Sequence, residues 1–269
     1  MRPLWMMLLL GLMAALPTRA EQRSMEVNGI TLSYQVHGEG EPLVLLHGFG
    51  GCGDMWSDFM PALSARYQLI IPDLRGHGGS TNPSGRFTMR DSATDLLALL
   101  DALKLPRVRA MGVSAGGMTL LHAATREPAR FEALVLIGAT TYFPAQAREI
   151  LAGVPDSVPP PVMDLFRACA TRGQPQVDEL MRQFNGLKDS YEDMTFTAPH
   201  LGTITARTLV VHGDRDEFFP VQIAADLYAA VPGAALWIVP EGDHVPIFDE
   251  RQPEFERITL AWLATPAPD

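Results

Sequence analysis

The 269-residue sequence predicts an α/β fold: a mostly parallel sheet of the eight-stranded type, with helices on both faces and an inserted helical cap. Short continuous apolar runs, typical of strands buried on both faces, alternate with segments of helical periodicity. The apolar run 108–113 passes into a helix-like stretch through one tight glycine-rich turn. A content of 47% hydrophobic and 19% charged residues also suits one compact domain with a sizeable core.

The expected strands are short. The first alternates apolar and polar residues, as a half-exposed antiparallel strand does, whereas the others are continuously apolar and suit a parallel sheet. In chain order they are Ile30–Val36, Pro42–Leu46, Gln68–Ile71, Val108–Val113, Ala133–Ile137, Thr208–Val211 and Leu236–Val239.

Helical patterns lie between these strands. The clearest has leucines on one stripe and is the segment 89–103. The expected helices are Trp56–Arg66, Met89–Leu103, Met118–Arg126, Val221–Val231 and Pro253–Leu263. Residues 140–206 break the alternation, because they hold helix-like pieces and no buried strand. Since a bare loop of that length is unusual, we interpret 140–206 as a helical cap inserted between core segments 21–139 and 207–269.

The first twenty residues have the pattern of a secretory signal peptide. Arg2 precedes an uncharged apolar run of 13 residues, Leu4–Leu16, which is short for a membrane span, and Pro17 ends that run. We therefore expect cleavage near Ala20 and an exported, periplasmic or secreted protein. An uncleaved anchor or a wrongly assigned start codon is the alternative. No other segment is long and apolar enough to cross a membrane.

The charge balance is acidic, with a formal net charge of −10. Without Arg2 and Arg19, 19 basic residues remain against 31 acidic ones, a net charge of −12. Such a field repels phosphate backbones, so nucleic acid is not an expected partner. The expected partner is a small ester-like molecule, and the sequence leaves the oligomeric state open.

The two cysteines, Cys52 and Cys169, are far apart in sequence. An exported protein can pair them, but pairing needs Cα atoms within about 7 Å. The sequence leaves their pairing open, with unpaired cysteines as the favoured expectation and a disulfide as the alternative. Their spacing does not suggest a metal site either, and we expect no metal and no organic cofactor.

The glycine-rich turn, Gly112-Val113-Ser114-Ala115-Gly116, has the pattern of a nucleophile elbow. Glycines two positions to either side of Ser114 fit a turn in which a Cβ would clash. This turn presents the Ser114 hydroxyl outside the sheet. It also leaves the Ala115 N–H at a helix start, where an oxyanion is stabilised.

A serine hydroxyl needs a base, and the base needs an orienting acid. His244 is the expected base, because it lies in a loop after the last strand and completes the order serine, acid, histidine. Asp214 and Asp216 both follow a strand end, and we favour Asp216, which lies further into its loop. A second oxyanion donor is expected from the Phe49 N–H, in the glycine-rich segment 47–51 after another buried strand.

With these pieces the chain resembles a serine hydrolase of the α/β-hydrolase fold. The resemblance covers about residues 25–263. It implies Ser114 as nucleophile, Asp216 as acid, His244 as base, and Phe49 and Ala115 as oxyanion donors. Dehalogenases and epoxide hydrolases of this fold use an aspartate nucleophile, so a serine at position 114 argues against both. The matching motifs are His47-Gly48-Phe49-Gly50, Asp73-Leu74-Arg75-Gly76-His77-Gly78-Gly79-Ser80, Gly112-Val113-Ser114-Ala115-Gly116-Gly117, Gly213-Asp214-Arg215-Asp216 and Asp243-His244-Val245-Pro246.

The sequence therefore predicts an exported carboxylic-ester hydrolase that works through an acyl-enzyme on Ser114. A lactonase, an amidase, a carbon–carbon bond hydrolase or a cofactor-free perhydrolase would use the same triad and differ in the cap and pocket. A binding protein on the same fold is a further possibility, although the complete set of Ser114, Asp216 and His244 argues against it.

Overall fold

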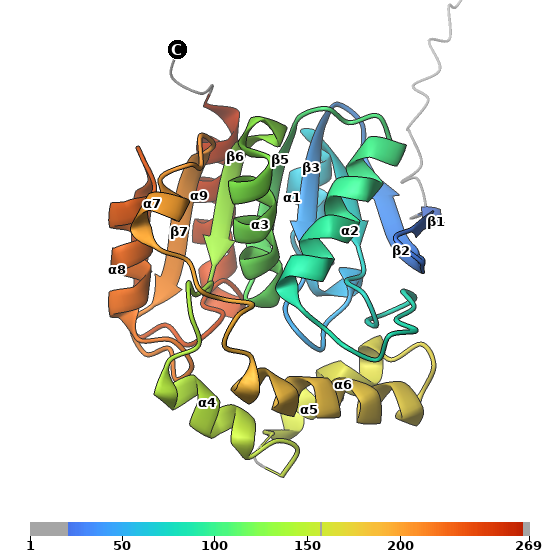
Figure 1. Cartoon of the computed structure of the whole chain (residues 1–269). Coiled ribbons are helices and arrows are strands. Elements are labelled where there is room, and N and C mark those ends of the chain that lie inside the picture. The colour runs from blue at the N-terminus through green and yellow to red at the C-terminus, as the bar shows by residue number, and fades with distance from the viewer. Residues whose placement is uncertain (1–20, 157, 266–269) are drawn as a thin grey trace, which may run out of the picture.

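The computed structural model describes residues 21–156 and 158–265. The expected signal peptide, residues 1–20, lies outside the described residues. In the described part the chain folds around one eight-stranded sheet (Figure 1). No helix in the described ranges is long and apolar enough to cross a membrane.

The sheet has the spatial order β1-β2-β4-β3-β5-β6-β7-β8. Strands β1 and β2, and β2 and β4, pair antiparallel, and every other neighbouring pair is parallel. This confirms the predicted mostly parallel α/β fold. The strands are β1 (Glu21–Val27), β2 (Ile30–His37), β3 (Glu41–Leu46), β4 (Tyr67–Pro72), β5 (Val108–Val113), β6 (Phe131–Ile137), β7 (Arg207–Gly213) and β8 (Ala235–Val239).

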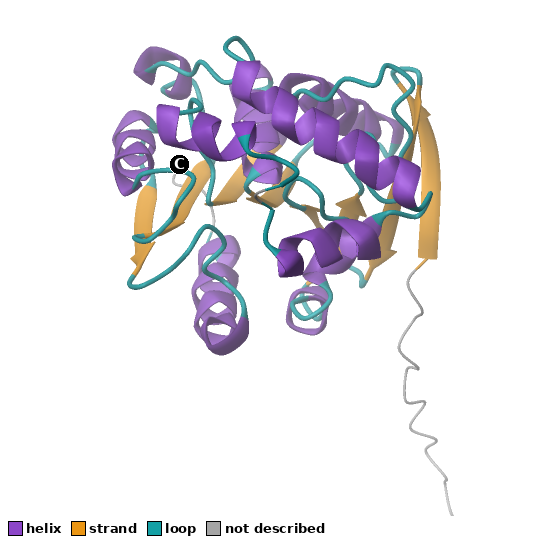
Figure 2. Ribbon diagram, turned by 90° about the horizontal axis from the view of Figure 1, so that it is seen from below, coloured by secondary structure: helices purple, strands orange, loops and turns teal. Residues whose placement is uncertain are grey.

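Helices cover both faces of the sheet, which forms the middle layer in Figures 1 and 2. On one face lie α2 (Met89–Ala102), α3 (Ala115–Arg126) and α8 (Val221–Ala230), and on the other lie α1 (Met60–Ser64) and α9 (Gln252–Ala264). Each face has its own buried apolar layer, because the central strands are buried on both sides. Short 3₁₀ helices occur at Gly53–Trp56, Pro128–Arg130, Leu187–Asp189 and Asp249–Arg251.

Two elements differ from the sequence prediction. Strand β1 was not expected, because its sequence EQRSMEV is polar and lacks the apolar signal of a strand. It forms at the sheet edge, where pairing with β2 supplies its hydrogen bonds. The helix expected over 56–66 is instead a 3₁₀ turn followed by the short α1. Trp56, Phe59 and Leu63 of that segment are almost fully buried, so the apolar spacing reflects packing more than a continuous helix.

In the described residues between β6 and β7 lie the α-helices α4 (Ala145–Ala152), α5 (Pro160–Cys169), α6 (Gln174–Gly186) and α7 (Ala198–Leu201). Figure 1 shows α4, α5 and α6 beyond the ends of the sheet strands. Helices α5 and α6 and the preceding turn form a small apolar cluster, which also contacts Phe49 and Phe184. We call residues 145–186 the cap helices below. They place aromatic side chains over the end of the sheet at which β5 stops.

Candidate active site

Ser114 lies in the turn between β5 and α3, with φ 49° and ψ −114°. This backbone conformation is strained for a residue with a side chain, and strain of this kind concentrates at functional sites. The flanking glycines permit the turn. A Cβ on Gly116 would lie 2.5 Å from the Leu46 carbonyl oxygen and 2.7 Å from that of His47. A Cβ on Gly112 would lie 2.5 Å from the Gly116 carbonyl carbon. The close packing thus fixes where the Ser114 hydroxyl stands.

The structure brings the three expected side chains together from three distant stretches of the chain. Ser114 Oγ lies 3.0 Å from His244 Nε2, and His244 Nδ1 lies 2.9 Å from Asp216 Oδ2. Because a carboxylate only accepts, Nδ1 carries the proton and donates it to Asp216. Nε2 then has a free lone pair for the Ser114 hydroxyl proton. This is the geometry that proton transfer from serine to histidine requires.

Asp216 is held as an ionised acceptor. Its other oxygen, Oδ1, accepts from the backbone N–H groups of Phe218 at 2.8 Å and Phe219 at 3.0 Å. Burial by itself raises the pKa of this carboxyl group. The hydrogen bond and charge of His244, with the Phe219 N–H, outweigh burial, so the pKa of Asp216 lies below its ordinary value. The side chain therefore stays negative and keeps His244 oriented.

Asp214, the alternative acid, contributes no side-chain contact to His244 among the contacts of the described residues. Its backbone N–H donates to the Val239 carbonyl at 3.2 Å, so the residue belongs to the turn after β7. The geometry thus separates the two aspartates and favours Asp216 as the orienting acid.

A fully buried histidine, His212, lies behind the acid. His212 Nε2 donates to the Phe219 carbonyl at 2.8 Å and lies 3.5 Å from Asp216 Oδ2. Burial lowers the pKa of His212, so it is neutral at neutral pH. In the structure it supports the loop that carries Asp216.

The segment His47–Gly51, called the oxyanion loop below, follows β3 and passes beside Ser114. A Cβ on Gly48 would lie 3.5 Å from the Ser114 Cβ, so the loop backbone is close to the serine. Ala115 is the first residue of α3, and the N–H groups of a first helical turn have no partner within their helix. Phe49 and Ala115 therefore lie on the two elements that flank Ser114. This arrangement is suited to stabilising a negatively charged oxygen.

Comparison with known proteins gives a consistent result. A family profile described as alpha/beta hydrolase fold matches residues 41–172. The serine hydrolase BPHL of Homo sapiens is 31% identical over 254 residues, which are 87% of this chain and 84% of that protein. The chain belongs to the α/β hydrolase family.

Two further relatives are named for different reactions. The pimeloyl-[acyl-carrier protein] methyl ester esterase of Chromobacterium violaceum is 27% identical, over 88% of this chain and all of that protein. The 2-hydroxy-6-oxo-2,4-heptadienoate hydrolase of Pseudomonas putida is 29% identical, over 80% of this chain and 87% of that protein. These relatives are named for the hydrolysis of different bonds, so the bond that this chain cleaves has to be argued from the site.

In this α/β hydrolase, aromatic rings surround the reactive groups. The rings of Phe218 and Phe219 lie 5.0 Å and 5.3 Å from the His244 ring, measured between centroids. Phe49 of the oxyanion loop stacks on Phe184 of α6 at 4.9 Å, and Phe184 lies 6.4 Å from Phe218. These rings come from the oxyanion loop, the cap helices and the loop that carries Asp216. The roles of Phe218 and Phe219 could not be predicted from the sequence, because only the fold shows that they lie beside His244.

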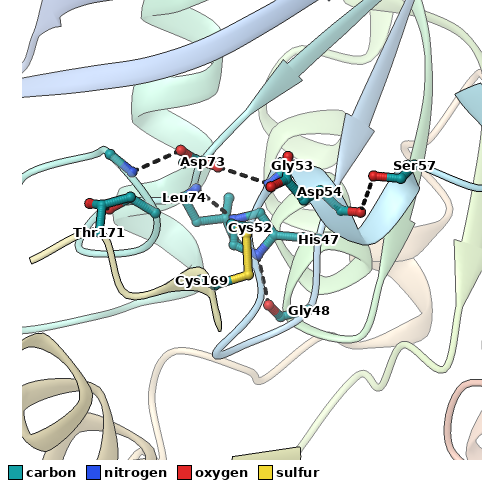
Figure 3. The surroundings of a disulfide bond; sticks show 12 residues. His47, Gly48, Cys52, Gly53, Asp54, Ser57, Asp73, Leu74, Cys169 and Thr171 are labelled. Atoms are coloured by element: carbon teal, nitrogen blue, oxygen red, sulfur yellow. Dashed lines mark hydrogen bonds between the residues drawn. A yellow bond between two sulfur atoms is a disulfide. The ribbon is translucent and has the colours of Figure 1, made fainter. Parts of the chain in front are cut away.

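Contrary to the sequence expectation, Cys52 and Cys169 form a disulfide, with Cα atoms 5.5 Å apart. Cys52 follows the oxyanion loop and Cys169 ends α5 (Figure 3). The expectation was wrong because docking of the cap helices on the core brings these positions together, and sequence distance carries no information about docking. Within the described residues, no group of three or more His, Cys, Asp or Glu side chains is placed to hold a metal ion.

Buried histidines make the stability of this hydrolase pH-dependent. Burial lowers the pKa of His47, and burial and His47 lower that of His77 to about 3. In the unfolded chain their pKa is about 6.5, so acidification protonates the unfolded state first and favours it. We expect the free energy of unfolding to fall from pH 7 to pH 5, by up to about 1.4 kcal/mol per pH unit for each such histidine. Urea titrations at both pH values measure this.

The variant His77→Gln isolates one contribution. Its amide can replace the Nδ1–H that His77 donates to the Arg75 carbonyl at 3.0 Å, but it does not titrate. The fall in stability between pH 7 and pH 5 should therefore be smaller in the variant. Equal falls in both proteins would contradict a neutral buried His77.

Proposed function

We propose that the chain is an exported serine hydrolase that cleaves carboxylic esters whose acyl group is uncharged and apolar. The observation that carries the proposal is the continuous hydrogen-bond series Ser114–His244–Asp216. This series ends at Ser114, whose backbone conformation is strained. The serine lies between the oxyanion loop and the start of α3, the two elements expected to supply the oxyanion donors.

The reaction follows from the roles of the three side chains. His244 Nε2 takes the Ser114 proton as Oγ attacks the ester carbonyl carbon, and the carbonyl oxygen becomes negative near the N–H groups of Phe49 and Ala115. His244 then gives its proton to the departing alcohol, and the acyl group remains on Ser114. A water molecule, deprotonated by His244, attacks the acyl carbon in the same way. The carboxylic acid leaves, and Ser114 regains its proton.

The aromatic surroundings support an apolar acyl group. Phe49, Phe184 and Phe218 present ring faces and edges next to the reactive groups, and such surfaces gain free energy by covering apolar atoms. An ionised substrate group placed against these rings would lose its hydration, and the rings themselves carry no opposite charge. The methyl ester esterase among the relatives supports the ester bond.

A carbon–carbon bond hydrolase is the second candidate, and the relative named for 2-hydroxy-6-oxo-2,4-heptadienoate favours it. That compound has no ester or amide bond, so its hydrolysis breaks a carbon–carbon bond. It also carries a carboxylate, which needs a cationic partner when it is buried. The rings that surround His244 and Phe49 favour the neutral ester over this dienoate. Lactone hydrolysis, amide hydrolysis and perhydrolysis use the same steps. Each of these reactions is assayed as well.

Export rests on the apolar N-terminal pattern and on the disulfide. Cys52 and Cys169 are paired in the structure, and disulfides persist mainly in oxidising compartments outside the cytosol. Both observations suit a protein that crosses a membrane before it folds.

One experiment tests the site and export together. The full chain is produced in a host able to export it, treated with a fluorophosphonate, and examined by intact and peptide mass spectrometry. The expected product lacks residues 1–20 and carries one phosphonate on Ser114. Labelling at another residue, or no labelling of folded protein, would reject the serine mechanism. If residues 1–20 remain attached, the predicted cleavage is rejected, whereas the serine mechanism is not.

The substrate class is tested with matched p-nitrophenyl esters. We expect kcat/KM for the butyrate and benzoate esters to exceed that for the mono-glutarate, which carries a carboxylate, by at least tenfold. A tenfold difference corresponds to about 1.4 kcal/mol, a small part of the cost of burying an unpaired carboxylate. The 2-hydroxy-6-oxo-2,4-heptadienoate is assayed alongside, and faster turnover of this dienoate than of the esters would favour the second candidate.

A further inference from the structure

The disulfide joins the two parts of the molecule that meet over Ser114. Cys52 directly follows the oxyanion loop, and Cys169 is the last residue of α5 in the cap helices. Both side chains are buried. Figure 3 shows the bridge next to His47 and Gly48, at the base of the loop that carries Phe49. The crosslink therefore acts on backbone that lies next to the reaction.

On the core side, the oxyanion loop is held at both ends. His47 is fully buried, with Nδ1 donating to the Gly48 carbonyl at 2.7 Å and Nε2 accepting from the Leu74 N–H at 3.0 Å. After the loop, the Gly53 N–H donates to Asp73 Oδ1 at 2.8 Å. Between these anchors lie three glycines and Phe49, a composition with high conformational freedom. Within the loop the Gly51 N–H donates to the Gly48 carbonyl at 3.1 Å, and contacts from outside add to this hydrogen bond.

On the cap side, the residues after Cys169 bind the glycine-rich loop that follows β4. Thr171 Oγ1 donates to the Gly78 carbonyl at 2.6 Å, and Arg172 Nη2 donates to the Gly76 carbonyl at 3.0 Å. Gln176 Nε2 reaches both carbonyls, at 2.9 Å and 3.0 Å. Asp73 Oδ2 in turn accepts from the Gly79 N–H at 2.9 Å.

These links form a closed circuit. It runs from the oxyanion loop through the disulfide to the segment 169–176, then to the glycine-rich loop, and returns through Asp73 to Gly53. The disulfide is the covalent step in that circuit. Every other step between these segments is a hydrogen bond, which contributes about 1 kcal/mol net.

Phe166 of α5 makes the coupling direct. Gly50 has φ +81°, and a Cβ there would lie 2.1 Å from the Phe166 ring. Phe166 also lies 6.1 Å from the Phe49 ring between centroids. A displacement of α5 would therefore move the surface against which the oxyanion loop rests.

We propose that the Cys52–Cys169 disulfide is a positioning crosslink for the reaction: it holds the oxyanion loop, and with it the Phe49 N–H, in the geometry that stabilises the transition state. This inference rests on the proposed function of the site. An oxyanion donor acts on a charge that exists only in the transition state, so its displacement lowers kcat more than it changes KM. Complete loss of one donor lowers kcat by about 10²–10³-fold. If breaking the disulfide only makes the oxyanion loop more mobile, kcat should fall by a smaller factor than this.

The test compares Cys52→Ser, Cys169→Ser and the double variant with the wild type, on a neutral p-nitrophenyl ester. Because all three break the same bond, we expect the same loss of kcat, at least tenfold, with KM changed less than threefold. Phe255→Leu is the matched control, because it removes buried apolar contacts in the α9 layer, away from the circuit. It should lower the melting temperature and leave kcat unchanged.

A second measurement covers variants that fail to fold. Wild-type protein is reduced with dithiothreitol, which converts the Cys52–Cys169 disulfide into two cysteine thiols and is itself oxidised to its cyclic disulfide. Both thiols are then alkylated, and folding is checked by circular dichroism. Folded, alkylated protein that retains full kcat would overturn the inference, as would unequal losses in the two single variants. Absence of turnover in oxidised wild type would instead overturn the proposed function.

Discussion

Removing the hydroxyl in Ser114→Ala is expected to lower kcat for ester hydrolysis about a million-fold, as in other serine triads. No other group in the site can form the acyl-enzyme, since His244 and Asp216 act on the serine proton and not on the acyl carbon. The variant should still fold, because alanine meets the same backbone strain at φ 49° as serine does. Burst-phase and steady-state assays with a p-nitrophenyl ester measure the loss.

Ser57→Ala is the control for this prediction. Ser57 is exposed, and its hydroxyl donates to the Asp54 carbonyl at 2.7 Å, away from the site. It should retain wild-type kcat and fluorophosphonate labelling. A Ser114→Ala protein that folds and still turns over the ester within tenfold of wild type would refute the assignment of the nucleophile.

The second large effect is expected at the acid. Asp216→Asn should lower kcat by about 10⁴-fold, a loss typical of a triad that loses its carboxylate. An amide can present its NH₂ group to Nδ1 and so favour the wrong tautomer of His244. It also removes the negative charge that stabilises the protonated imidazole formed during attack. The effect should be in kcat, measured with the same neutral ester near neutral pH.

Asp214→Asn is a matched control two residues away. His244 pairs with Asp216 and not with Asp214, so the Asp214→Asn variant should stay within tenfold of wild type. Equal losses in the two variants would show that the loop as a whole matters and that Asp216 has no special role. The lowered pKa of Asp216 adds a check on the acid side. Because the carboxyl group stays ionised below its ordinary pKa, its protonation should not limit activity above about pH 4.

The order of motifs along the chain was enough to predict the fold and to choose the residues that meet in the site. Ser114 was predictable because a strand–turn–helix with flanking glycines leaves few other conformations. His244 was predictable because the carboxyl ends of parallel strands lie at the same end of the sheet. A loop after the last strand can therefore reach the turn after β5. These inferences use local geometry and topology, which the sequence pattern reflects directly.

What the sequence did not predict depends on how parts dock. Strand β1 is polar and gains its hydrogen bonds only at the edge beside β2. The Cys52–Cys169 bond depends on α5 resting on the oxyanion loop, and nothing local to either cysteine encodes that contact. The neutral state of His77 follows from burial among rings that come from separate segments, Phe49 and Phe87.

The pair Phe218–Phe219 separates two tasks within one dipeptide. Its main-chain amides hold the acid, while its rings form a wall beside the imidazole. An amide is the same for nearly every amino acid, so the partly buried Phe218 side chain can change while its N–H still holds Asp216, whereas the Phe219 ring is part of the buried core and is less free to change. Proline is the exception, because it lacks the N–H. New substrate preferences can therefore arise here by ordinary point mutation while the proton-transfer machinery stays intact.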